Sequence, residues 1–228
     1  MTAKQKGPRV WDGPTRLFHW LLVCLLVFSW WSAENHMMDW HRLSGITVVG
    51  LVIFRLLWGV IGSSTARFSR FVRGPGASIA YLRGGDGKIE QPGHNPLGGY
   101  SVILLLLLLT AQVASGLLAT DIDGLESGPL SYLVSFDQGR WAAEMHEFSF
   151  NLLLAASALH VLAILFYLIV RRRNLVTAMF TGSDGFYRDG QGGMVAAGWL
   201  RLATALVIAG LGAWYLWNGL SFAPVPSY

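Results

Sequence analysis

The chain has 228 residues, of which 53% are hydrophobic, 13% aromatic and only 13% charged. Soluble domains are usually about 25% charged, so this composition excludes a disordered chain, a nucleic-acid module and an ordinary soluble enzyme. The net charge is +4, but the basic residues stand beside long apolar runs, so we expect no nucleic-acid partner. The single Cys24 excludes an internal disulfide framework and haem attachment through a C-x-x-C-H motif.

Five apolar runs are long enough to cross a bilayer, which takes about 17–25 residues. We expect spans at 17–33, 43–61, 97–119, 148–170 and 198–217. The first run is longer and more aromatic than the apolar part of a signal peptide, and no clean A-x-A site follows it. We therefore expect it to remain in the protein as a membrane span. The sequence predicts an all-α integral membrane protein with membrane lipid around it.

The lysines and arginines are distributed very unevenly between the connections. Thirteen of the 17 lie in residues 1–16, 62–96 and 171–197, whereas Arg42 and Arg140 are the only ones in the alternate connections. Cytoplasmic loops carry the excess of positive charge in membrane proteins. We therefore expect the N-terminus inside and the C-terminus outside, which agrees with an odd number of spans.

Four of the six histidines lie in or at the ends of the predicted spans. His160 is well inside the fourth span and His19 is within the first turns of the first, whereas His41 and His146 lie at the outer ends of the second and fourth. Ionisable side chains in a membrane span are costly and are functional candidates by default. We interpret His36 as a loop residue, and His94 as a loop residue with a quinone site as its alternative.

The spacing of these histidines suits two haems stacked across a bilayer. His146 and His160 are 14 residues apart, so on one helix they lie about 21 Å apart along the axis and within about 40° of the same face. By depth, His19 pairs with His160 at the inner level and His41 with His146 at the outer level. Two neutral imidazoles give a six-coordinate haem iron suited to electron transfer. Zinc fits less well, because it takes three or four ligands in one place.

Small and cationic residues support the same interpretation. Gly45 lies one turn after His41, where it leaves room for a flat macrocycle, although tight helix packing is the alternative reading of such glycines. Arg55 lies in mid-span and needs an anionic partner, for which a haem propionate is a candidate. Arg16 and Arg42, each beside a proposed ligand, are further candidates for propionate binding.

Four segments, in order, resemble one known family. They are VWDGPTRLFHW at 10–20, HRLSGITVVGLVIFRLLWG at 41–59, GHNPLGGY at 93–100 and MHEFSFNLLLAASALHV at 145–161. The chain resembles the bacterial cytochrome b561 family, including the b-type cytochrome subunits of nickel–iron hydrogenases, over about residues 9–180. The resemblance implies two b haems held by the positions of His19, His41, His146 and His160. It also implies electron transfer between the quinone pool and a redox partner.

The resemblance refines the expected architecture and location. We expect a four-helix haem-binding bundle plus a peripheral fifth transmembrane helix, which minimal family members are not expected to have. Residues 1–180 would form the di-haem cytochrome b domain, and 181–228 a loop, the fifth helix and a short periplasmic tail. The location implied is the bacterial inner membrane, with the N-terminus cytoplasmic and the C-terminus periplasmic.

Three functions stay open at this level. The leading hypothesis is an electron-transfer subunit whose acidic outer loops dock a c-type cytochrome or an enzyme subunit in the periplasm, with quinone bound at either membrane face. The second is a stand-alone oxidoreductase, such as a superoxide oxidase or quinone reductase, which the acidic outer face disfavours for an anionic substrate. The third is a passive membrane anchor or a proton-relay transporter, which would need no functional haem.

Overall fold

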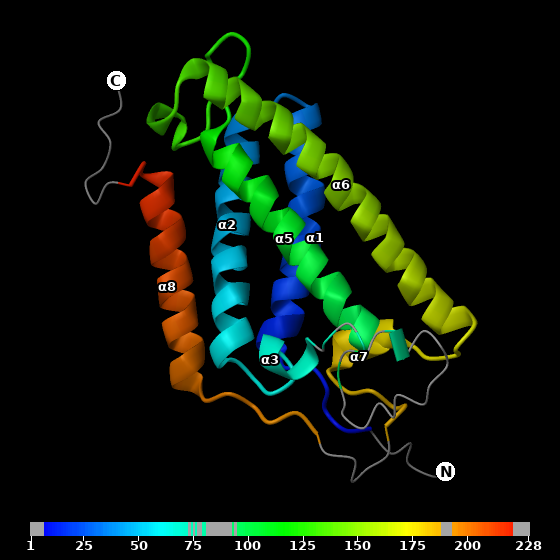
Figure 1. The fold of residues 1–228 in the computed structure, drawn as a ribbon. Helices are drawn as coiled ribbons and strands as arrows, with labels where there is room; N and C mark the ends of the chain where they lie inside the picture. Colours follow the sequence, from blue (N-terminus) through cyan, green and yellow to red (C-terminus); the bar gives the residue numbers. More distant parts are fainter. Residues whose placement is uncertain are drawn as a thin grey trace. The chain divides into compact units, whose positions relative to one another are not determined.

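The computed structural model describes residues 7–72, 74, 76, 79–80, 93, 95–187 and 193–220. Regular secondary structure in this part of the chain is helical, with two isolated β-bridges at Arg9–Ser183 and Thr120–Ser127. Figure 1 shows the helices in chain order: α1 (Gly13–Glu34), α2 (Met38–Ile61), α3 (Phe68–Phe71), α5 (Pro96–Leu118), the 3₁₀ turn η1 (Ser131–Leu133), α6 (Phe136–Ile169), α7 (Leu175–Thr181) and α8 (Trp199–Trp217).

Five of these helices, α1, α2, α5, α6 and α8, are long and apolar enough to cross a membrane. The all-α integral membrane fold predicted from hydropathy is therefore confirmed, and the five predicted runs coincide with these helices. An Asn-Pro pair starts α5: the Asn95 side chain accepts a hydrogen bond from the backbone N–H of Gly98 at 2.6 Å, and Pro96 is the first helical residue.

The fourth span differs from expectation at its start, because α6 begins at Phe136 rather than near 148. A capping box explains the earlier start. The Ser135 hydroxyl accepts from the backbone N–H of Gln138 at 3.3 Å, and the Gln138 side chain accepts from the backbone N–H of Ser135 at 3.0 Å. The first turns are polar, so hydropathy alone did not include them.

The chain forms two compact units, and the division falls within each long helix. Unit 1 contains Met1–Phe18, Leu56–Leu104 and Ser157–Ala203, and unit 2 contains His19–Arg55, Leu105–Ala156 and Thr204–Tyr228. Each unit is described by itself below.

Unit 2 has an aliphatic core to which four helices contribute. Its fully buried members are Val48 and Val52 of α2, Leu109 of α5 and Leu153 of α6, and α1 adds partly buried leucines, Leu22, Leu25 and Leu26. The fifth helix packs on α2 through small residues. A Cβ on Gly50 of α2 would meet the Cβ of Ala213 at 3.4 Å, and one on Gly212 would meet Ile53 at 3.0 Å. The α8 helix lies beside α2 in this unit (Figure 1), as expected for a helix added to a four-helix bundle.

Unit 1 is held together by buried polar contacts as well as by apolar packing. The Arg173 guanidinium donates to Asp184 at 2.5 Å, and both side chains are more than nine-tenths buried. The same guanidinium lies 4.5 Å from the centre of the Phe186 ring. Burial alone lowers the pKa of Arg173, but the hydrogen bond and charge of Asp184 outweigh it, so the pKa is raised. This pair fixes the segment that follows α6.

Candidate functional site

Two histidines of unit 2 come together from different helices. His41 lies in the first turns of α2 and His146 lies in α6, and their ring centres are 6.0 Å apart with the ring planes at 87°. Metal–imidazole bonds are about 2 Å long, so a separation of about 6 Å leaves room for one metal ion that both rings would bind. The depth argument from sequence expects these two side chains at one level.

Backbone carbonyls orient both imidazole rings. His41 Nδ1 lies 2.9 Å from the carbonyl oxygen of Ser29, and His146 Nδ1 lies 2.9 Å from that of Gln112. A carbonyl oxygen can only accept, so each Nδ1 carries the proton and donates it. Each Nε2 then keeps its lone pair, which is the arrangement that haem and other metal sites use to set ring tautomer and orientation.

The Gln112 side chain links His146 to a second polar residue of α6. Gln112 Nε2 lies 3.0 Å from His146 Nε2, and the Ser149 hydroxyl donates to Gln112 Oε1. Gln112 and Ser149 are both buried, at 8% and 7% exposure. The amide therefore contacts the nitrogen atom that would bind iron, and binding there requires the amide to move away.

Glycines on α2 and α5 give this region space. A Cβ on Gly45, one turn after His41, would have no neighbour within 4 Å, whereas one on Gly116 would meet the His146 ring at 2.8 Å. The open volume beside Gly45, together with two imidazoles that keep their Nε2 lone pairs, fits a haem. His41, His146 and Gly45 are the residues that would hold the group in unit 2.

The arginines predicted to bind propionates lie in three different environments. Arg42 makes ion pairs with Asp39 at 2.7 Å and with Glu126 at 2.6 Å. Arg55 is 3% exposed in the middle of α2. Arg16, in unit 1, donates to the carbonyl oxygen of Phe180. The ion pairs of Arg42 neutralise its charge, so Arg42 is a weak candidate for binding an anionic group.

The two histidines predicted for the second haem belong to different units. His19 is in unit 2, where its ring contacts that of Trp20 with centres 4.9 Å apart, and half-buried His160 is in unit 1. Their pairing stays a prediction. The helix α6 that carries His146 and His160 runs from Phe136 to Ile169, so both histidines lie on one continuous helix, as the spacing argument requires.

The spacing argument does not use His36 and His94. His36 is exposed in the turn between α1 and α2, with a φ of 57°, as expected of a loop residue. His94 lies outside the described residues. In the part of the chain that the structure describes, no group of three or more His, Cys, Asp or Glu side chains is arranged to hold a metal ion.

Sequence reasoning missed the residues that orient the two imidazoles. Ser29 and Gln112 act through backbone carbonyls, which every residue type has, so the sequence does not reveal them. The Gln112 side chain did offer a signal, because it is a buried amide within the apolar run of α5. A polar side chain in a span is a functional candidate on the same grounds as a histidine.

The match to known proteins agrees with this site. Residues 10–182 match the family described as prokaryotic cytochrome b561, and α8 lies beyond the matched part. No curated protein and no solved structure matches the chain. The more specific resemblance to hydrogenase subunits stays a prediction. Five of its helices are able to cross a membrane, so the chain is a multi-pass membrane protein. It is a b-type cytochrome that functions in electron transfer, and it belongs to the prokaryotic cytochrome b561 family.

Proposed function

We propose that the chain carries electrons across the bacterial inner membrane through two b haems, between the quinone pool and a redox partner in the periplasm. One haem would be held by His41 and His146, and the other by His19 and His160. The observation that carries the proposal is the imidazole pair of unit 2, in which the rings are 6.0 Å apart and each Nδ1 has a backbone acceptor. When bound, haem supplies a one-electron carrier.

The protein residues determine what such a haem can do. The carbonyls of Ser29 and Gln112 hold the Nδ1 protons, so both rings present neutral Nε2 donors. Two imidazole ligands close the iron coordination shell and leave no position for a substrate. This arrangement favours electron transfer over chemistry at the iron, and it therefore supports an electron carrier over a stand-alone oxidase.

The acidic connections support docking of a basic partner on the periplasmic face. Exposed acids lie around unit 2 at Glu34, Asp39, Asp123, Asp137, Glu144 and Glu147. The ion pairs of Arg42 with Asp39 and Glu126 compensate part of this charge, and the rest remains available for steering a c-type cytochrome or a basic enzyme subunit. Such docking weakens steeply as salt concentration rises.

A quinone site completes the proposal, at a haem edge on one membrane face. The Asn95 side chain, next to the quinone candidate His94 in the sequence, caps α5 at Gly98 and donates to the Tyr167 hydroxyl. Because both amide atoms are used within unit 1, its role there is structural. The family match supports the redox function in general, while the quinone and the partner belong to the proposal.

The decisive experiment is a haem count on the purified full chain. A pyridine haemochrome assay normalised to protein, with a reduced-minus-oxidised spectrum, should give two b haems per chain. His160→Ala should remove one haem and leave the spectrum of the other, and His146→Ala should leave the complementary spectrum. A single haem, or the same haem lost in both variants, would refute the pairing. No haem in a folded chain made under haem-replete conditions would refute the electron carrier.

A further inference from the structure

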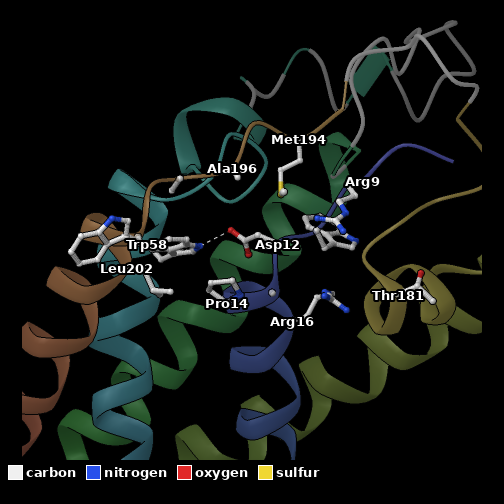
Figure 2. A pocket seen from close by; sticks show the side chains of 13 residues that line it. Arg9, Asp12, Pro14, Arg16, Trp58, Thr181, Met194, Ala196 and Leu202 are labelled. Atoms are coloured by element: carbon white, nitrogen blue, oxygen red, sulfur yellow. Dashed lines mark hydrogen bonds between the residues drawn. The ribbon is translucent and has the colours of Figure 1, made fainter. Parts of the chain in front are cut away.

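Unit 1 contains a cavity of about 370 Å³ at the ends of three membrane-spanning helices. The segment before α1, the last turns of α2 and the segment leading into α8 line it, with Arg9, Asp12, Arg16, Trp58, Met194 and Trp199 among the lining residues. Figure 2 shows Asp12 between the Trp58 side of the cavity and the side with the two arginines.

The charged groups of the cavity are not paired with one another. Both oxygens of Asp12 are occupied by neutral donors: the backbone N–H of Thr15 at 2.7 Å and the Trp58 indole N–H at 2.8 Å. Neither Arg9 nor Arg16 forms an ion pair with any residue that the structure describes. Asp12 therefore caps α1 and fixes Trp58, while the two guanidinium groups keep their charge for another partner.

A backbone carbonyl holds the Arg16 guanidinium, which also carries one buried N–H donor. One terminal nitrogen donates to the carbonyl oxygen of Phe180, and Nε is buried with no acceptor among the described residues. Gly182 allows the chain to approach this closely: its φ is +84°, and a Cβ there would meet the Trp11 carbonyl oxygen at 2.8 Å and Arg16 Nε at 3.3 Å. A guanidinium held in this way is ready to bind an oxyanion.

The segment before α8, which lies beyond the family match, closes one side of the cavity. The backbone N–H of Met194 donates to the carbonyl oxygen of Arg9 at 2.8 Å. Val195 exchanges two hydrogen bonds with Ser64, at 3.0 and 2.9 Å. These contacts hold the segment in place, so the fifth helix contributes a wall to a site that residues 10–182 alone would leave incomplete.

From this cavity we infer a binding site for an anionic phosphate group, carried by a phospholipid headgroup or free in solution, with Arg9 and Arg16 as its cationic ligands. The position at helix ends is the headgroup level of a bilayer, where exposed tryptophans such as Trp199 are enriched. A neutral quinone would leave both arginine charges without a counter-charge, whereas a phosphate group compensates them.

The test uses native mass spectrometry on the full-length holoprotein in detergent. The probe is phosphatidylglycerol, with inorganic phosphate as a second arm that separates the two sources. Arg9→Gln is the main variant, because the Arg9 side chain is exposed and is not a predicted haem ligand or propionate partner. Arg201→Gln is the matched control: it removes the same charge from an exposed arginine at the start of α8 that does not line the cavity. Ala196→Phe fills the cavity and keeps both arginines.

We expect one tightly retained phosphatidylglycerol per chain. Arg9→Gln should weaken retention by roughly tenfold or more, the effect of one charge-assisted hydrogen bond. Ala196→Phe should weaken retention by occupying the cavity, and Arg201→Gln should leave retention unchanged. Displacement by millimolar phosphate, or a phosphate adduct without lipid, would assign the site to the free anion. Equal retention in Arg9→Gln and Arg201→Gln, or binding of neither probe by the wild-type chain, would overturn the inference. The haem count of each variant shows that the cytochrome itself is intact.

Discussion

The imidazole site of unit 2 and the cavity of unit 1 differ in how their polar side chains are paired. In unit 2, the Gln112 amide contacts His146, backbone carbonyls accept from His41 and from His146, and Arg42 is neutralised by two carboxylates. In the cavity of unit 1, Asp12 is bound by neutral donors, and Arg9 and Arg16 have no ion pair with a described residue. The first pattern holds neutral donors for a metal, and the second leaves positive charge for an anion.

The largest expected effect tests whether the paired imidazoles of unit 2 hold a haem. Replacing His41 or His146 by Ala removes one of the two proposed haem ligands, so each variant should lose close to one haem equivalent per chain. The pyridine haemochrome assay measures this directly. His36→Ala is the control, because His36 is an exposed turn residue and its loss should leave the haem count unchanged. Equal haem in His146→Ala and His36→Ala would contradict the assignment.

A smaller substitution tests whether a haem occupies the open space beside His41. A Cβ on Gly45 has no protein neighbour within 4 Å, so Gly45→Ala should leave the haem-free chain as stable or about 0.5–1 kcal/mol more stable. If haem fills that space, the added methyl group should displace it and lower haem occupancy.

Gly210 on α8 is the matched position for this substitution, because a Cβ there also has no neighbour within 4 Å. Gly210→Ala should show the same stability change with full haem occupancy. Unchanged haem content in Gly45→Ala would mean that the macrocycle lies elsewhere in unit 2. Thermal unfolding and haem counting on the two variants are sufficient to decide.

The sequence predicted the five membrane-spanning helices, because hydropathy acts along the chain. The five spans and the Asn95 cap follow from local composition. The orientation of the rings did not follow, since the acceptors of His41 and His146 are backbone carbonyls that any residue type provides. The unit 1 cavity was also missed, because it needs segments near residues 9, 58 and 194 that come together only in three dimensions.

In unit 1, a substitution of Asp12 tests the stability of the folded chain rather than its haem content. Asp12→Ala removes the cap of α1 and leaves the buried Trp58 indole N–H without its acceptor. The lost cap costs about 1 kcal/mol and the unsatisfied donor about 1–3 kcal/mol, so the total loss of stability should be about 2–4 kcal/mol. Thermal unfolding of the purified chain checks this, with exposed Asp123→Ala as the control. A loss no larger than that of the control would show that Asp12 does not fix Trp58.

The smallest expected effect concerns the competition between Gln112 and iron for His146. The Gln112 amide occupies His146 Nε2, whereas its backbone carbonyl holds Nδ1. Gln112→Leu removes the competitor and keeps the carbonyl, and Ser149 retains the carbonyl oxygen of His146 as an acceptor at 3.2 Å. One hydrogen bond is worth about 0.5–1.5 kcal/mol, so the haem-free chain should bind haem at this site about two- to tenfold more tightly. Titration of the haem-free chain with haem measures the change. Weaker binding would instead mean that the Gln112 amide helps to hold the haem. The hydrogen bonds of Gln112 would then support the haem-bound protein rather than occupy His146 only while haem is absent.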